Sequence, residues 1–212
     1  MTDRHYQNVL EDQVALLGHD FDAQTLEKLL CYHALLMKWN KAYNLTSVRD
    51  PLAMITRHIV DSLSVLSFID SAGFKSLVDV GSGAGLPGVL LAICRPELKV
   101  TSIDSNGKKT RFQNQVKIEL ALDNLSIIRG RAEDCQGQMF DAVISRAFAS
   151  LADMISLTHQ LCSNEGVFLA MKANISKREI AQLPVGYALV KSHTLVVPNE
   201  EGERHLLEIR RV

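Results

Sequence analysis

Apolar residues in the first third of the chain recur at intervals of three and four positions, the spacing of one buried helix face. One such pattern covers about residues 22–41, and a second covers about residues 50–68. The second begins with Asp50-Pro51, a capping residue followed by a proline suited to the first helical position. We therefore expect residues 1–70 to form a helical extension. The second helix should bury one apolar face: Ile55, Ile59, Leu63 and Leu66.

Further along, short apolar runs alternate with helical patterns, as is typical of a mostly parallel sheet with helices on both faces. The tail has two β-rich segments joined by NEEG, which predict an antiparallel hairpin at the sheet edge. This ending favours the methyltransferase version of the α/β sheet over a nicotinamide-binding domain. Strands are expected at 77–80, 100–103, 125–128, 142–144 and 166–171, helices at 87–94, 108–122 and 151–161, and the hairpin within 187–198 and 203–212.

Length and composition limit the class of protein. The chain has 212 residues, 47% hydrophobic and 22% charged, which suits one domain with an extension. Its longest apolar runs fall short of the ~18 residues of a membrane span, and its polar N-terminus is unlike a signal peptide. We therefore expect a cytoplasmic protein without membrane contact. The widely spaced cysteines predict reduced thiols rather than disulfides or a metal site: Cys31, Cys94, Cys135 and Cys162.

The stretch LVDVGSGAGLPG follows a predicted strand and opens a predicted helix, the context that a nucleotide-binding turn requires. It fits two templates. Gly83-x-Gly85-x-x-Gly88 matches the dinucleotide pattern GxGxxG, and Asp79 to Gly85 matches the DxGxGxG pattern of S-adenosylmethionine (SAM) methyltransferases. Because no GK[ST] follows, a P-loop is excluded.

Acidic residues near the ends of three predicted strands favour SAM over a nicotinamide dinucleotide. Asp79 would repel a pyrophosphate but could accept a hydrogen bond from the ammonium group of SAM. Asp104 fits the ribose of either cofactor. Ala132-Glu133-Asp134 suits the adenine edge of SAM, through a backbone N–H and an acidic side chain. The alternative for Glu133 and Asp134 is an acid pair at a helix N-terminus.

Five stretches of the chain are similar to one family. KWNKAYNLTSVRDP, RHIVDSL, DVGSGAGLPG, VISRAFASL and GERHL resemble the RsmG (GidB) family of bacterial 16S ribosomal RNA guanine-N7 methyltransferases, in the same order, from about residue 20 to 212. The resemblance implies a class I SAM-dependent methyltransferase of Rossmann-like α/β fold. It also implies a substrate, guanine 527 of 16S rRNA, as naked RNA or in a small-subunit particle.

The resemblance also implies which residues bind the cofactor. Those carried over from the family are Gly81, Leu86, Ala132, Glu133 and Arg146, and those at the usual positions of such enzymes are Asp79, Gly83 and Asp104. The family often has proline where this chain has Ala84, a small departure. We expect a monomer that binds neither DNA nor metal.

Guanine N7 carries a lone pair and no proton at neutral pH, so we expect direct attack on the SAM methyl group and name no catalytic residue. Arg146 would hold a phosphate, guanine O6 or the cofactor carboxylate, or else form a structural ion pair. Lys172 would meet either substrate phosphate or solvent. Basic residues are in excess between 99 and 131, although the net charge is −1, and three of them are candidates for RNA backbone contact: Lys108, Lys109 and Arg111.

Several further residues have two interpretations. His58 and Asp61 lie three apart on one helical face, as a structural pair or as contacts to RNA or cofactor. Arg204-His205 opens the last strand and would touch RNA or cap the hairpin. Trp39 and Tyr43 are spaced for the core or for stacking on a base. Two rival functions remain: an NAD-linked oxidoreductase, which lacks a catalytic pair for hydride transfer, and a non-catalytic RNA-binding module, which need not retain the glycine turn.

Overall fold

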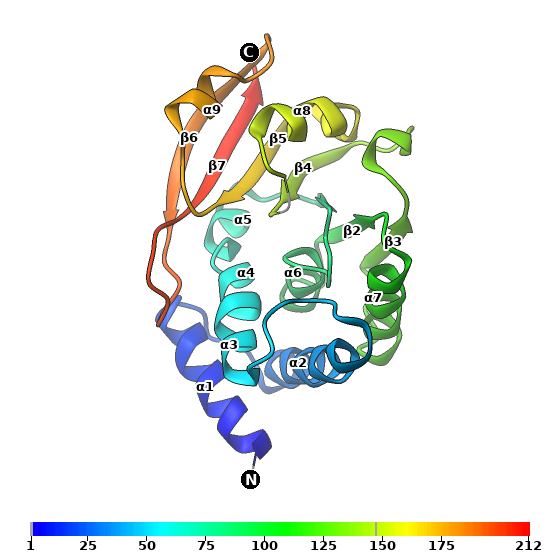
Figure 1. Ribbon diagram of the computed structural model, residues 1–212, viewed down its shortest axis with the longest axis vertical. Coiled ribbons are helices and arrows are strands. Elements are labelled where there is room, and N and C mark those ends of the chain that lie inside the picture. Colours follow the sequence, from blue (N-terminus) through cyan, green and yellow to red (C-terminus); the bar gives the residue numbers. More distant parts are fainter. Residues whose placement is uncertain (1, 147) are drawn as a thin grey trace.

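The computed structural model describes residues 2–146 and 148–212. These residues contain a seven-stranded sheet of order β3-β2-β1-β4-β5-β7-β6 (Figure 1). The first five strands are parallel, β7 is antiparallel to β5, and β6 pairs antiparallel with β7 at the edge. The predicted fold class, including the C-terminal hairpin, is therefore confirmed. The strands are β1 (Ser76–Val80), β2 (Lys99–Asp104), β3 (Leu125–Arg129), β4 (Phe140–Ser145), β5 (Cys162–Lys172), β6 (Tyr187–Leu195) and β7 (Arg204–Arg211).

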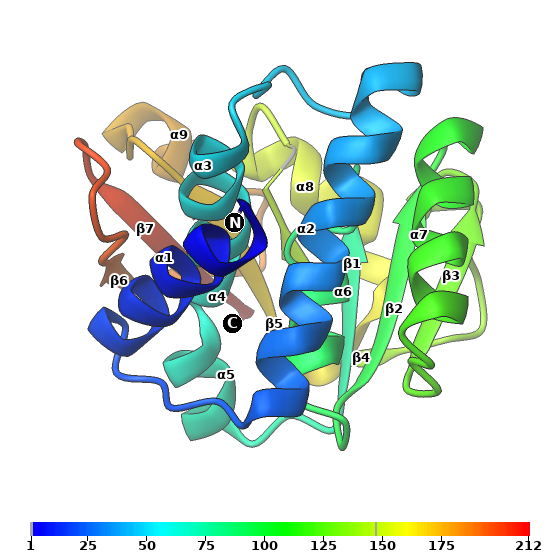
Figure 2. The same ribbon diagram turned by 90° about the horizontal axis from the view of Figure 1, so that it is seen from below.

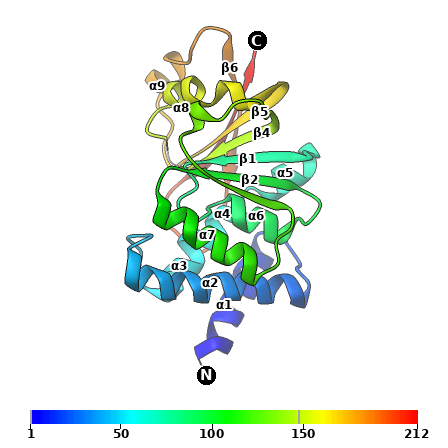
Figure 3. The ribbon, with the colours of Figure 1, turned by 90° about the vertical axis from the view of Figure 1, so that its right-hand side faces the viewer.

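Helices cover both faces of the sheet (Figure 3). On one face lie α6 (Gly88–Cys94) and α7 (Gly107–Glu119), with α2 (Ala23–Tyr43) packed outside them (Figure 2). On the other face lie α8 (Leu151–Thr158) and α9 (Lys177–Ala181). The chain begins with α1 (Thr2–Leu16). Two short 3-10 helices, η2 (Ala132–Asp134) and η3 (His159–Leu161), follow β3 and α8.

The second predicted helix of the extension is less regular than its sequence pattern. Asp50 caps it by accepting a hydrogen bond from the amide of Ala53 at 2.7 Å. It then runs through α3 (Pro51–Met54), the π-helical segment η1 (Ile55–Val60), α4 (Asp61–Leu63) and α5 (Leu66–Ala72). The predicted apolar face is confirmed, because Ile55, Ile59, Leu63 and Leu66 are all fully buried.

Among the element boundaries that differ from the sequence patterns, two have a local reason. The helix expected to reach residue 122 ends at Glu119, where Ala121 adopts a positive φ of 49°. Strand β5 begins at Cys162, four residues early, because its first residue already pairs with Phe140, before a register shift at which β5 carries the extra residues.

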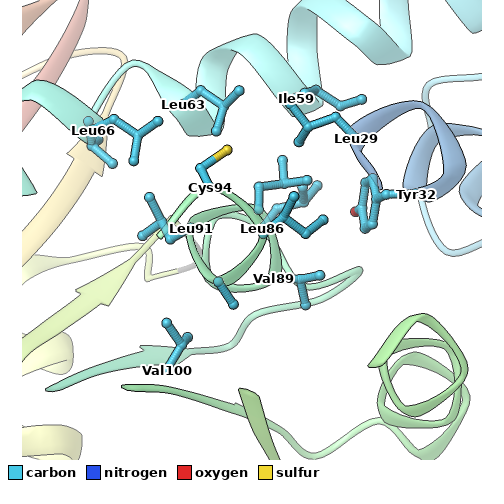
Figure 4. Packing of buried hydrophobic residues seen from close by; sticks show 14 of the residues in the cluster. Leu29, Tyr32, Ile59, Leu63, Leu66, Leu86, Val89, Leu91, Cys94 and Val100 are labelled. Atoms are coloured by element: carbon cyan, nitrogen blue, oxygen red, sulfur yellow. The ribbon is translucent and has the colours of Figure 1, made fainter. Parts of the chain in front are cut away.

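The helical extension and the sheet share one hydrophobic core. Residues of α2, η1, α4 and α5 converge on α6 and β2: Leu29, Tyr32, Ile59, Leu63, Leu66, Leu86, Val89, Leu91, Cys94 and Val100 (Figure 4). A second cluster lies on the α8 face of the sheet, around Val78, Val143 and Phe168. The helical stretch Pro51–Ala72 is long and apolar enough to cross a membrane, but 67% of its apolar window is buried in this core.

Candidate active site

The glycine turn follows β1 and needs glycine at several points. Gly81 and Gly83 have positive φ angles of 69° and 61°, which side-chain-bearing residues rarely adopt. Gly85 has φ 87°, and a Cβ there would lie 2.2 Å from Val89 Cγ2. The amides of Gly81 and Ser82 donate to the carbonyl of Ile103 at 2.9 and 3.2 Å, which ties the turn to β2. The turn is therefore a rigid cradle at the carboxyl end of the sheet.

Two buried side chains hold this turn from behind. The hydroxyl of Tyr32 on α2 donates to the carbonyl of Ala84 at 2.8 Å. The amide of Gln113 on α7 donates to Ser82 Oγ and to the carbonyl of Gly83, both at 2.8 Å. Neither residue was predicted from the sequence, since each occupies a buried helical position typical of an ordinary core. The hydroxyl and amide groups are the only signals that could have indicated a polar target.

Asp79 supports the turn and lines none of the cavities described below. Its side chain is fully buried, and Oδ2 accepts a hydrogen bond from the amide of Gly88 at 2.8 Å. Burial raises the pKa of Asp79 to about 7, against the opposing effect of the Gly88 hydrogen bond. Its other oxygen, Oδ1, has no hydrogen-bond partner among the described residues. The predicted contact with a cofactor ammonium group stays a prediction.

The first cavity, which we call the Glu133 cavity, has a volume of about 210 Å³. Asp104 lies at its base, where its carboxylate accepts hydrogen bonds from the amides of Gly83 and Asn106, both at 2.8 Å. Glu133 is 39% exposed on η2 and lies 3.6 Å from a guanidinium nitrogen of Arg131. The structure thus brings together the predicted residues of two strand ends. The lining is Val80, Gly81, Ile103, Asp104, Ser105, Gly130, Arg131, Ala132, Glu133, Phe148 and Leu157.

The second cavity, the turn cavity, has a volume of about 290 Å³ and lies between the glycine turn and the loop after α2. Asn40 fixes this loop, because its side chain accepts from the amide of Thr46 at 2.9 Å and donates to the carbonyl of Val48 at 3.1 Å. The lining is Leu45, Thr46, Ser47, His58, Gly81, Ser82, Gly83, Ala84, Leu86 and Arg146.

His58 borders the turn cavity as a neutral imidazole. Its Nδ1 lies 3.0 Å from the carbonyl of Arg57, so it is the donor, and Nε2 accepts from the Thr46 hydroxyl at 2.7 Å. Burial, reinforced by the charge of Arg146, lowers the pKa of His58 to about 4. His58 is therefore bonded to Thr46, whereas Asp61 accepts hydrogen bonds from Arg146 and Arg204, so the two residues hold the helix through different partners.

The third cavity, the arginine cavity, has a volume of about 240 Å³. Arg146 Nη1 donates to Asp61 Oδ2 at 2.7 Å, and Arg204 Nε donates to Asp61 Oδ1 at 3.2 Å. Arg146 also lines the turn cavity, while Gly81 is common to the turn cavity and the Glu133 cavity. The three cavities therefore form a row along the carboxyl ends of the strands. The lining of the third is Arg57, Asp61, Arg146, Met171, Lys172, Ala173, Leu195, Arg204 and His205.

Lys172 lies at this site, but its ammonium group is already held. Nζ donates to Glu179 Oε1 at 2.7 Å and to the carbonyls of Phe148 and Ala149 at 3.1 and 3.0 Å. Only 15% of its side chain is exposed. The ammonium group is therefore bound within the protein, where it secures the segment after β4. Ala147, in the VISRAFASL motif, lies outside the described residues.

Of the basic residues at the start of α7, Lys109 reaches the glycine turn. Lys108 and Arg111 are exposed, and neither forms an ion pair within residues 2–146 or 148–212. Lys109 is half-buried, with Nζ 3.8 Å from the position of a Cβ built on Gly83. Positive charge is therefore available next to the row of cavities.

Two other ambiguous groups are placed by the structure. Trp39 is half-buried and packs edge-on against Phe112 of α7, with ring centroids 5.7 Å apart. Trp39 therefore packs against the core, as one of its two interpretations predicts. Tyr43 contacts Trp39 but is 38% exposed, so it is not a core residue. His205 Nε2 lies 3.2 Å from Glu203 in the hairpin, whereas Arg204 turns to Asp61.

Comparison with known proteins decides the family. The model of one family, described as rRNA small subunit methyltransferase G, matches residues 25–207. The chain belongs to this family. Membership in the methyltransferase G family confirms the resemblance, the methyltransferase class and the dependence on SAM predicted from the sequence.

Individual relatives extend over nearly the whole chain. The ribosomal RNA small subunit methyltransferase G of Pseudomonas syringae pv. syringae is 49% identical over 212 residues, 100% of this chain and 97% of the relative. That of Marinobacter nauticus is 48% identical over 203 residues, 95% of this chain and 94% of the relative.

Solved structures share the fold at low identity. TrmN from Thermus thermophilus has a TM-score of 0.58 at 13% identity, covering 74% of this chain and 53% of its own. A SAM-dependent methyltransferase from Thiobacillus denitrificans in complex with S-adenosyl-L-homocysteine has a TM-score of 0.50 at 12% identity, covering 70% of this chain and 91% of its own. Both place the sheet of this family member among methyltransferase folds.

Proposed function

We propose that this chain transfers a methyl group from SAM to N7 of guanine 527 in 16S rRNA, in line and without a covalent enzyme intermediate. The observation that carries this proposal is the row of three cavities at the carboxyl ends of the strands. Ligands bind at this edge in open α/β sheets, where the strand order reverses. Here the reversal falls between β1 and β4, which are followed directly by Gly81 and Arg146.

The Glu133 cavity fits the adenosine part of SAM. Its carboxylates, Asp104 and Glu133, are hydrogen-bond acceptors for ribose hydroxyls and the adenine amino group. Phe148 and Leu157 provide apolar walls for the base. Ala132 is the residue whose backbone would meet the adenine edge. The methionine part would then lie over Gly81 and Gly83, in the turn cavity.

The residues around the turn cavity suit a reaction that needs alignment rather than proton transfer. Bound SAM supplies an activated methyl group on sulfur. Since guanine N7 is unprotonated at neutral pH, no general base is needed, and neutral His58 is already engaged with Thr46. The chain's task is to fix the base beside the turn and to exclude water, with Leu45 and Leu86 as apolar walls.

The helical extension is part of this active site. We infer that residues 1–70 pack on a methyltransferase domain of residues 71–212 and complete its cavities. The loop after α2 covers the turn cavity, and the helix beginning at Pro51 brings His58 to one cavity and Asp61 to the next.

The RNA would lie over the basic start of α7. Lys108 and Arg111 are exposed at the start of this helix, and half-buried Lys109 reaches the glycine turn, so these cations are available to phosphates. We therefore propose that the chain acts as a monomer in the cytoplasm on the small-subunit rRNA. It would bind neither membranes nor DNA in this role.

The first experiment tests atom, substrate and activity together. 16S rRNA from cells with and without this gene is treated with borohydride and aniline, which cleave at 7-methylguanine, and is scanned by primer extension. We expect a stop at guanine 527 that disappears on deletion and returns with the intact gene but not with Glu133→Ala. Identical patterns with and without the gene would refute the proposed substrate.

A further inference from the structure

The arginine cavity has more positive charge than a methyl transfer to an uncharged base requires. Four cationic side chains, Arg57, Arg146, Lys172 and Arg204, line it with a single carboxylate, Asp61. The acids paired with Arg57 and Lys172, Glu200 and Glu179, do not line the cavity. With these two ion pairs counted as neutral, Arg146 and Arg204 against Asp61 leave a net charge of +1 at the cavity.

Asp61 holds two guanidinium groups at a fixed separation. Each of its oxygens accepts from a different arginine, Oδ2 from Arg146 and Oδ1 from Arg204, and its side chain is only 11% exposed. Arg146 is also anchored by a hydrogen bond of 3.2 Å to the buried Ser62. The carboxylate is thus covered, while the side chains of Arg146 and Arg204 remain 24% and 31% exposed in the cavity wall.

The two arginines come from strands that are separated in the sheet by β5. Arg146 follows β4, and Arg204 opens β7 beyond the hairpin loop. A second ion pair, between Arg57 and Glu200 at 2.7 Å, fastens that loop to the same helix. The helix beginning at Pro51 therefore sets the position of the hairpin relative to the parallel sheet.

We propose that the arginine cavity binds a phosphodiester group of the RNA next to the methylated nucleotide, with Arg146 and Arg204 as phosphate ligands and Asp61 as their positioning residue. The guanidinium fork matches a phosphate better than any other group in proteins. An extruded base must carry its own backbone to the protein surface, so a phosphate site is needed beside the base site. Because Arg146 also lines the turn cavity, the base site and the phosphate site are adjacent.

The phosphate site is tested with small ligands that contain guanine. The choice of guanine as the base rests on the proposed function. Guanosine and guanosine 3′,5′-bisphosphate are titrated by NMR into the protein loaded with S-adenosylhomocysteine. The phosphates should increase the affinity about tenfold for the wild type, and most of this gain should disappear in Arg204→Gln. The matched control is Arg210→Gln, since Arg210 lies on the same strand and pairs with Glu208 at 2.9 Å outside the cavity. A gain unchanged in Arg204→Gln would overturn the proposal.

The positioning role of Asp61 is tested on RNA. Asp61→Asn should raise the KM for small-subunit RNA about tenfold, with kcat nearly unchanged and a smaller loss of SAM affinity, since Arg146 also lines the turn cavity. Asp61→Glu should restore part of the loss. The slope of log K against log salt should fall by about 0.7 in Arg204→Gln, the value for one phosphate contact to a single strand. Equal losses of SAM and RNA affinity in both variants would assign the cavity to the cofactor and refute the proposal.

The two proposals can fail separately. If the wild type does not methylate 16S rRNA but the bisphosphate gain depends on Arg204, the proposed substrate is wrong and the phosphate site stands. If 16S rRNA is methylated and the gain is absent, the phosphate site is wrong. Thermal unfolding of each variant, compared with Arg210→Gln, separates an effect on ligand binding from an effect on folding.

Discussion

The carboxyl group of Asp79 is fully buried beneath the glycine turn, where Oδ2 accepts a hydrogen bond from the amide of Gly88. Tyr32 reaches the same turn from α2 with a hydroxyl that is equally buried. Burial raises the pKa of Tyr32, so this hydroxyl keeps its proton and remains a donor. Both side chains act on backbone groups of the turn, which explains why residue types alone did not reveal their roles.

The raised pKa of Asp79 predicts how stability depends on pH. The pKa is about 7 in the folded protein, whereas an unperturbed aspartate has about 3.9. Between these values unfolding releases a proton, so the contribution of Asp79 to the free energy of unfolding falls as pH rises through this window. Asp79→Asn removes this titration. In urea unfolding at several pH values, the free energy of unfolding of the variant should rise relative to that of the wild type from about pH 4 to 7. A constant difference, as expected for the exposed control Asp123→Asn, would contradict the assignment.

The Tyr32 hydroxyl should matter for both fold and cofactor. Tyr32→Phe leaves the carbonyl of Ala84 without its buried donor, which should lower the free energy of unfolding by about 1–3 kcal/mol. SAM affinity should fall as well, because Ala84 lines the turn cavity. Urea unfolding and calorimetric titration measure the two effects. Tyr43→Phe on the same helix, with an exposed ring, serves as the control.

At the scale of elements, hydrophobic periodicity predicted most of the helices and strands. It did not predict how distant segments of the chain contact one another. The strands and the face formed by Ile59 and Leu63 followed from spacing, since burial on one side imposes that spacing. The π-helical segment η1 did not, because one widened turn leaves the apolar pattern nearly unchanged. The partner of Asp61 also escaped prediction, since Arg146 lies 85 positions away and only the folded chain brings them together.

The start of α7 carries the predicted contact with RNA phosphates. Replacing Lys108 and Lys109 together by alanine should weaken RNA binding and reduce its dependence on salt, by about 0.7 in the slope for each phosphate that is no longer bound. Filter binding over a range of salt concentrations measures this slope. Lys117→Ala, in the last turn of the same helix, should leave it unchanged. A double variant that changes only the unfolding free energy would show that this end of α7 is a solvated helix face.

At the scale of the whole molecule, one core joins the extension to the sheet, as Leu29 and Ile59 pack with Leu91 and Val100 (Figure 4). Trp39, the single tryptophan of the chain, lies at the contact between α2 and α7. Its fluorescence therefore reports on the junction between the two segments.

The shared core predicts one cooperative unfolding transition. Tryptophan fluorescence, which follows the junction, and far-UV circular dichroism, which follows helices and sheet, should give the same urea midpoint and the same slope. The alternative is a fluorescence transition at lower urea, which would mean that residues 1–70 detach before the sheet unfolds. Addition of SAM should move both curves together to higher urea.

Arg146 forms part of the wall between the turn cavity and the arginine cavity. Because Arg146 borders both sites, binding at one site can change the affinity of the other. Any such coupling is reciprocal: each ligand changes the affinity for the other by the same factor. Donor and RNA would then not add independently, and a change at Arg146 would appear in both dissociation constants. Changes at Glu133 and Arg204, one at each end of the row, would appear in one constant each. Comparing these three positions measures the coupling free energy between the two substrates.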